Sequence, residues 1–346
     1  MDRRTSGSPL PRIFKNLASS VFSIALTLIG LLAVTFIIGR VMPIDPVLAV
    51  VGDKASNEVY QAAYKAMGLD KPLLTQFAIY MKDVATGNFG MSTLTARPVS
   101  QDIIRVFPAT LELATIATFL GVIFGVPAGV IAAVKKGSWI DQLIRLIGLF
   151  GYSMPIFWLG LMGLLIFYGK LDWVAGPGRL DVYFEDIVPT VTGLITVDAL
   201  IAGETEIFWN AISHLILPAS LLGYYSLAYI SRMTRSFMLE QLSQEYITTA
   251  RVKGLSEFTV IWRHGLRNVM VPLITVIALA YAGLLEGSVL TESIFAWPGI
   301  GQYITNALFN ADMAAVLGGT VVIGVVFVGL NLLSDILYKI VDPRAK

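Results

Sequence analysis

The chain has 346 residues, of which 55% are hydrophobic and 14% are charged, and its mean hydropathy is +0.72. Soluble domains carry about 25% charged residues, so this composition excludes an ordinary water-soluble protein and predicts an all-α, polytopic membrane protein. The net charge of +1 gives no indication of a nucleic-acid partner, and the absence of cysteine excludes disulfides, thiol catalysis and cysteine-ligated metals.

Four basic residues precede the first apolar stretch: Arg3, Arg4, Arg12 and Lys15. That stretch runs from Leu17 to Ile38, which is longer than the apolar region of a secretory signal, and no cleavage site made of small residues follows it. We therefore expect an N-terminal tail over residues 1–16 and a retained first transmembrane helix over residues 17–39.

Six runs of about 20 mostly apolar residues are long enough to cross a hydrocarbon core about 30 Å thick. They lie at 17–39, 108–134, 143–168, 213–231, 269–290 and 314–338. A long loop over residues 40–107 separates the first run from a predicted five-helix core over residues 108–338, and a tail over residues 339–346 follows. Because the number of spans is even, both ends of the chain are expected on one side of the membrane.

The distribution of Lys and Arg decides which side that is, since basic residues in short loops tend to stay in the cytoplasm. The N-terminal tail, the loop after the second span, the loop after the fourth span and the C-terminal tail are basic, whereas residues 291–312 contain neither Lys nor Arg. We therefore predict a multi-pass membrane protein with both termini in the cytoplasm.

Two outer loops carry local signals. Ser56 is a predicted N-cap for a helix from Asn57 to Met67, and Lys71-Pro72 marks the next turn.

The third loop, residues 170–212, is acidic, and we interpret its carboxylates as a solvated face; the alternative is a vestibule that attracts cations. Its acidic residues include Glu185, Asp186, Asp198, Glu204 and Glu206.

Gly121, Gly125 and Gly129 recur at every fourth position of the second span. This spacing places the three glycines on one helix face, where a second helix backbone can approach closely. Simple helix packing accounts for the pattern, although a translocation path that opens and closes would use the same feature.

The predicted cytoplasmic loop over residues 232–268 is basic and has the pattern of a helix. Leu239, Leu242, Tyr246 and Ala250 fall at helical spacing, and Gly254 can end the helix in the left-handed conformation. Ser256 is a candidate N-cap for a second helix. Such an element could lie on anionic lipid or could enter a groove in a partner protein.

The segment from Tyr246 to Leu255 resembles the EAA loop of ATP-binding-cassette importer permeases. Further fragments resemble the peptide branch of that family and occur in the same order. They are residues 40–46, Met67 to Leu73, Pro98-Val99, Pro108 to Ala114, Glu292 to Gly301, Asn331 to Asp335 and Asp342 to Arg344. On these motifs the chain is identified as a member of the dipeptide and oligopeptide permease family.

The resemblance implies the fold of a type I importer permease, with six transmembrane helices and a cytoplasmic coupling-helix loop, in the cell inner membrane. It implies three protein partners: a second homologous permease subunit, cytoplasmic ATPase subunits and an extracytoplasmic solute-binding protein. Residues implied to couple to the ATPase are Glu245, Tyr246, Thr248, Thr249, Ala250, Lys253 and Gly254. Thr248 and Thr249 replace the glutamate and alanine of the general motif, as they do in the peptide branch.

No Walker A sequence is present, so ATP hydrolysis is expected from a separate polypeptide. We expect no catalytic residue, no metal and no cofactor in this chain.

The outer segment after the fifth span is interpreted as an entry lip or binding-protein contact, because exposed aromatic residues without positive charge suit recognition; the alternative is an interfacial aromatic belt. Its candidate residues are Glu292, Phe295, Trp297 and Gln302.

The competing hypothesis is an ion-coupled secondary transporter or channel that works without an ATPase. Such proteins usually place ionisable residues well inside their spans. Here the candidates lie close to the ends of the predicted spans: Glu112, Arg145, His214, Glu286 and Asp335. We therefore prefer the ATP-driven importer, with peptides or a similar small solute as cargo.

Overall fold

The computed structural model of the chain describes residues 10–41, 45–52 and 54–341. Within these residues the fold is helical, and β-type pairing is limited to one isolated bridge between Met91 and Pro98. The all-α prediction is confirmed. Residues 1–9, 42–44, 53 and 342–346 lie outside the described part, and with them Arg3, Arg4 and parts of two motifs used above.

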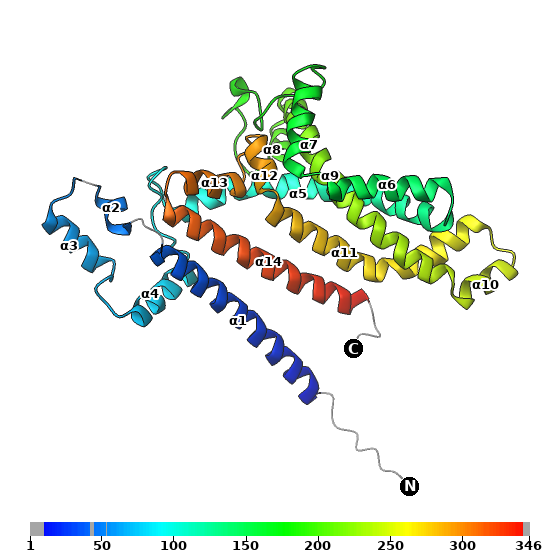
Figure 1. The fold of residues 1–346 in the computed structure, drawn as a ribbon, viewed down its shortest axis with the longest axis horizontal. Helices are drawn as coiled ribbons and strands as arrows, with labels where there is room; N and C mark the ends of the chain where they lie inside the picture. Colours follow the sequence, from blue (N-terminus) through cyan, green and yellow to red (C-terminus); the bar gives the residue numbers. More distant parts are fainter. Residues whose placement is uncertain (1–9, 42–44, 53, 342–346) are drawn as a thin grey trace, which may run out of the picture. The chain divides into compact units, whose positions relative to one another are not determined.

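Five long helices of the described chain have the length and hydropathy needed to cross a membrane (Figure 1). They are α1 (Leu10–Val41), α5 (Val99–Val134), α9 (Thr205–Leu242), α11 (Leu266–Gly287) with the π-helical turn η3 (Thr259–Gly265) before it, and α14 (Met313–Val341). A sixth span exists if the bent pair formed by α6 (Trp139–Ser153) and the helix from Ile156 to Tyr168 crosses the membrane once.

The third predicted span, 143–168, is not one straight helix. It bends by 98° between Ser153 and Ile156, and continues as α7 (Ile156–Gly163) and the π-helical turn η1 (Leu164–Tyr168). Met154 has ψ 132°, outside the helical region. Proline disfavours the helical conformation of the residue before it, so Pro155 accounts for the break.

The chain divides into two compact units, which we describe separately. The first unit comprises residues 1–100 and 310–328 and contains α1, α2 (Pro46–Val51), α3 (Asn57–Ala66), α4 (Leu73–Ala85) and the start of α14. The Ser56 side chain accepts a hydrogen bond from the Val59 N–H at 3.4 Å, which confirms the predicted N-cap of α3. The Thr35 and Tyr80 hydroxyls share a hydrogen bond of 3.0 Å that joins α1 to α4.

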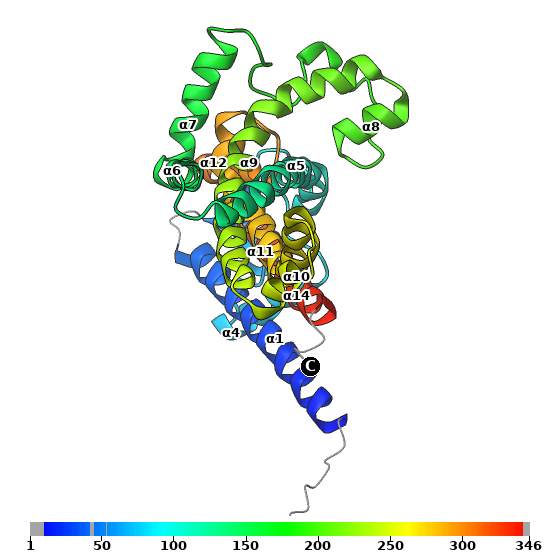
Figure 2. The ribbon, with the colours of Figure 1, turned by 90° about the vertical axis from the view of Figure 1, so that its right-hand side faces the viewer.

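The second unit is built around α9, which runs between α8 (Ile195–Ala202) at one end and α10 (Glu245–Val252) at the other (Figures 1 and 2). Helices α6, α7, α8 and α11 all contact α9. A central apolar cluster forms where α5, α9 and α11 meet, and it contains Val130, Ile230, Met238, Val269 and Leu273. This unit also contains α12 (Val289–Ile294), α13 (Ile300–Phe309) and the end of α14.

The glycine repeat of the second predicted span lies in the contact between α5 and α9. A Cβ atom at Gly121 would lie 2.4 Å from the Ser226 hydroxyl oxygen, and one at Gly129 would lie 2.5 Å from the Ser231 carbonyl oxygen. These distances leave no room for a side chain, so the glycines allow the two backbones to approach. The packing interpretation of the repeat is confirmed.

The third loop forms a small folded region with its own apolar cluster of Phe184, Val188, Ala199 and Ile207. Asp198 is buried, so the predicted solvated face is wrong for this residue. Its carboxylate accepts hydrogen bonds from the backbone and side chain of Thr192 and from the N–H groups of Val191 and Gly193. Burial favours a higher pKa for Asp198, but these hydrogen bonds outweigh it and lower the pKa.

Candidate functional site

The predicted coupling segment forms a short helix, α10, between two turns. The sequence pattern predicted one helix through Leu242 and Tyr246, but α9 ends at Leu242 and α10 begins at Glu245, so that prediction is wrong. Gln244 is extended with ψ 149°, and the Ser243 hydroxyl donates to the Glu240 carbonyl at 2.7 Å, which satisfies an acceptor at the end of α9.

Helix α10 ends close to the glycine that was predicted to stop it, and the predicted N-cap of the next helix follows. Gly254 has φ +79°, the left-handed conformation that favours glycine, and it ends the turn after the helix. The Ser256 hydroxyl then accepts a hydrogen bond from the Thr259 N–H at 3.3 Å, as expected for an N-cap. Across this turn the Arg251 guanidinium makes a bidentate ion pair with Glu257, at 2.8 and 3.2 Å.

One face of α10 is anchored and the opposite face is open. Ile247 and Ala250 are buried against Val260 and Leu242, which fixes the helix on the end of α9 and on η3. Ala250 is therefore an internal contact of this chain. The other six predicted coupling residues are exposed: Glu245, Tyr246, Thr248, Thr249, Lys253 and Gly254.

Three large apolar side chains beside these residues were not singled out from the sequence. Val252 is 83% exposed, Phe258 is 73% exposed and Leu255 is 40% exposed. Apolar residues in an otherwise polar, basic loop were the signal that could have identified them. Together with the exposed face of α10 they form a surface suited to contact with another protein; we call residues 245–258 the α10 surface.

The second predicted site contains a carboxylate enclosed by the fold. Glu292, fully buried in α12, accepts hydrogen bonds from the hydroxyls of Thr110 at 2.7 Å and Ser288 at 2.9 Å. The Gln302 N–H donates to its other oxygen at 3.0 Å. Burial raises the pKa of Glu292, although the hydrogen bonds from Thr110, Gln302, Ser288 and Gly301 oppose this effect.

The aromatic residues of this segment are buried, so the expectation that they are exposed is wrong. Trp297 is fully buried and Phe295 is 2% exposed. The Trp297 indole N–H donates to the Ala109 carbonyl of α5 at 2.8 Å, which explains why a polar indole can lie inside the unit. These residues support the segment after the fifth predicted span from within and do not form its surface.

A buried ion pair connects the same region to the third loop. The Glu112 carboxylate of α5 accepts a hydrogen bond from the Arg179 Nε at 3.1 Å and two from Thr196, at 2.9 Å from its N–H and 2.6 Å from its hydroxyl. Arg179 also lies over the Trp297 ring, 5.7 Å from its centroid. The motif at residues 108–114 therefore joins the segments that follow the third and fifth predicted spans.

Steric crowding explains why glycines occur at two positions shortly after Trp297. A Cβ atom at Gly299 would lie 2.5 Å from the Glu292 carboxyl group, and one at Gly301 would lie 2.7 Å from the Val289 Cα. The enclosed carboxylate and the two glycines are therefore parts of one arrangement, in which the chain closes tightly around Glu292.

Comparison with known proteins gives consistent results along the chain. Residues 125–346 match the family described as binding-protein-dependent transport system inner membrane component, and residues 13–114 match the N-terminal family of the same transport-system membrane components. A probable D,D-dipeptide transport system permease protein of Escherichia coli K12 is 43% identical, over 93% of this chain and 95% of the relative. A di/tripeptide permease protein of Pseudomonas aeruginosa is 42% identical, over 92% of this chain and 95% of the relative.

A dipeptide permease protein of Haemophilus influenzae is also 42% identical, over 96% of this chain and the full length of the relative. Among solved structures, a chain of the MetNI methionine ABC transporter in an inward-facing conformation is similar. The TM-score is 0.52 at 16% identity, and the similarity covers 69% of this chain and 96% of that chain. This similarity concerns the fold.

Proposed function

Because the chain belongs to the family of binding-protein-dependent transport system inner membrane components, we propose that its cargo is a short peptide and that the α10 surface couples it to a separate ATPase. The chain itself is a transmembrane permease subunit of an ATP-driven importer. The peptide cargo is supported by the names of its relatives, which are dipeptide or di/tripeptide permease proteins.

The observation that carries the coupling proposal is the division of α10 into two faces. Ile247 and Ala250 attach the helix to its own chain, so a force on the open face would move α9 and η3 with it. The open face combines polar residues with the exposed apolar side chains of Val252 and Phe258. An apolar centre with a polar surround is the usual composition of a protein interface.

The remaining partners follow from the architecture of such importers. We propose that a second homologous permease completes the translocation path and that a solute-binding protein delivers peptide on the outer side. Both termini and the α10 surface lie in the cytoplasm in this arrangement, as the basic loops favour. Glu292, Phe295, Trp297 and Gln302 then shape the outer entry from within, and the exposed residues between them contact the binding protein.

A pull-down of the tagged chain from mild detergent tests the coupling proposal. Val252→Glu adds a charge to the α10 surface, and Val182→Glu makes the same change at a site of equal exposure, 83% against 82%, in the third loop. We expect the parent and Val182→Glu to retain a co-purifying ATPase, and Val252→Glu to lose it. A parent chain that transports in vesicles with neither ATPase nor ATP would instead support the ion-coupled transporter.

A further inference from the structure

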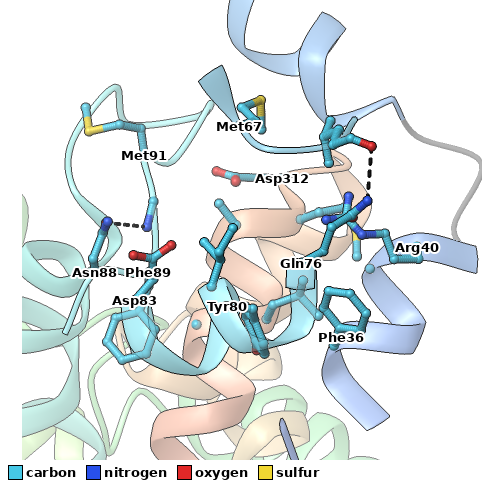
Figure 3. Close-up of a pocket in the computed structure, with 18 of the residues that line it drawn as sticks. Phe36, Arg40, Met67, Gln76, Tyr80, Asp83, Asn88, Phe89, Met91 and Asp312 are labelled. Carbon is cyan, nitrogen blue, oxygen red and sulfur yellow. Dashed lines mark hydrogen bonds between the residues drawn. The ribbon is translucent and has the colours of Figure 1, made fainter. Parts of the chain in front are cut away.

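The first unit contains a cavity of about 320 Å³ that belongs to neither site described above (Figure 3). Its wall is formed by the end of α1, the α3–α4 connection, one face of α4, residues 88–93 and the start of α14. Small-molecule sites in proteins begin at about this size and combine apolar walls with a few polar groups. The cavity has this composition.

The walls of the cavity are held by interactions of the unit itself. Asp312, fully buried, accepts hydrogen bonds from the Ser92 hydroxyl, from the Leu94 N–H and, at its other oxygen, from the Ala315 N–H. These bonds connect the segment before α5 to the start of α14. The Thr35–Tyr80 hydrogen bond connects α1 to α4. The cavity is therefore formed before any ligand enters.

Three polar groups on the wall have unused binding capacity. The Gln76 amide N–H₂ donates to the carbonyls of Leu69 at 3.0 Å and Lys71 at 2.7 Å, but its buried Oε1 accepts no hydrogen bond from the described residues. A buried acceptor of this kind is rare and calls for a donor. Arg40 and Asp83 form no ion pair with any described residue, and Figure 3 shows them on opposite sides of the cavity.

The spacing along α4 sets the size of a matching ligand. Gln76, Ile79, Tyr80 and Asp83 share one helix face, and Gln76 lies beside Arg40 in Figure 3. Asp83 lies seven residues after Gln76, which corresponds to about 10 Å along the helix axis. An extended peptide covers about 3.5 Å per residue, so two or three residues bridge this distance.

The other wall residues could accommodate ligand side chains of varied shape. Met67, Met91 and Met313 line the cavity together with Phe36 and Phe89. Methionine side chains are flexible and polarisable, and they adapt to different apolar partners. A site of this kind would fix the two ends of a peptide and tolerate its sequence.

We propose that this cavity binds a zwitterionic di- or tripeptide, with its carboxylate at Arg40, a peptide N–H at Gln76 Oε1 and its ammonium group at Asp83. The choice of a peptide over another zwitterion rests on the function proposed above. On the proposed orientation, α2 to α4 lie on the outer side of the membrane, where cargo arrives. The cavity is then a cargo-binding site on the permease itself.

The test uses the full chain alone in nanodiscs of phosphatidylglycerol, with trialanine as the probe and calorimetry as the readout. We expect C-terminal amidation or N-acetylation of trialanine to weaken binding to the parent at least tenfold. Arg40→Gln should bind the free and amidated peptides equally, and Asp83→Asn should bind the free and acetylated peptides equally. Asp70→Asn, on the α3–α4 connection but outside the cavity wall, should behave as the parent.

Each contrary result has a distinct meaning. No trialanine binding by the parent, or unchanged discrimination in Arg40→Gln and Asp83→Asn, would overturn the proposal. Loss of binding when phosphatidylethanolamine is added to the nanodiscs would show that the zwitterionic lipid headgroup is the occupant, which also overturns it. The ATPase pull-down is independent, so retained ATPase without peptide binding would remove the cavity proposal and leave the importer function intact.

Discussion

At the scale of single residues, the enclosed Glu292 carboxylate accounts for much of the motif that follows it. Its oxygens accept hydrogen bonds from Thr110, Ser288 and Gln302, residues of three different segments. Gly299 and Gly301 are required because a side chain at either position would overlap the packed segment. A pattern that looks like an exposed aromatic lip is therefore a packing arrangement around one buried acid.

The raised pKa of Glu292 predicts a pH dependence of stability. In the unfolded chain the carboxyl loses its proton near its ordinary value of 4.5, whereas burial holds the proton to higher pH in the folded chain. The free energy of unfolding should therefore fall as pH rises from that value to the folded pKa, with a slope of at most about 1.4 kcal/mol per pH unit, and stay level above it.

The measurement is the thermal unfolding midpoint in detergent over the acidic to neutral range, for the parent and for Glu292→Gln. Glutamine has the same size and no titration, so the variant should lack the Glu292 contribution to the slope. Identical pH profiles for the two proteins would contradict the prediction.

At the scale of elements, a buried ion pair fixes the part of α9 that leads to α10. Asp141, near the start of α6, is 1% exposed and accepts hydrogen bonds from the Arg235 Nε at 2.7 Å and Nη2 at 2.8 Å. The Gly137 N–H also donates to it, at 3.0 Å. Since Arg235 lies two turns before the end of α9, this pair joins α6 to the base of the α10 surface.

Breaking this pair should cost much more than breaking an exposed one. We expect Asp141→Asn to lower the free energy of unfolding by about 3 kcal/mol, because Arg235 loses the partner of a mostly buried pair. Glu257→Gln removes the partner of Arg251 in a pair whose side chains are 44% and 60% exposed, and should cost less than about 1 kcal/mol. Denaturation of the purified chain compares the two, and equal losses would contradict the prediction.

At the scale of the whole molecule, the absence of cysteine provides a direct test of orientation. Val182→Cys and Val252→Cys each introduce a single, highly exposed thiol, one in the third loop and one next to α10. With both termini in the cytoplasm, a membrane-impermeant maleimide should label Val182→Cys in intact cells. It should label Val252→Cys only after the membrane is opened.

The reverse labelling pattern would mean that the chain is inserted the other way round, and the α10 surface could not then meet a cytoplasmic ATPase. Labelling of both thiols in intact cells would point to leaky membranes, which a cytoplasmic marker enzyme controls for. In the chain expressed without its ATPase, the two positions have nearly equal exposure. A difference in labelling then reports the side of the membrane and not the reactivity of the site.

Features that depend on neighbouring residues or on the bilayer could be predicted from the amino-acid sequence. Apolar runs had to match the thickness of a membrane, so the long helices were predictable from hydropathy. Ser56, Gly254 and Ser256 act within one helical turn, through a cap hydrogen bond or a left-handed backbone, and their roles were predicted correctly. The family motifs carry the same kind of information, since their order along the chain identifies the permease.

The burial of polar and aromatic residues, in contrast, became visible only in the folded chain. Thr110 and Glu292 are 182 positions apart in the chain, and Asp141 and Arg235 are 94 apart, so no local pattern pairs them. The cavity likewise needs α1, α4 and α14 together. Burial depends on which distant segments meet, and a carboxylate or an indole is tolerated inside only where those segments supply its hydrogen bonds.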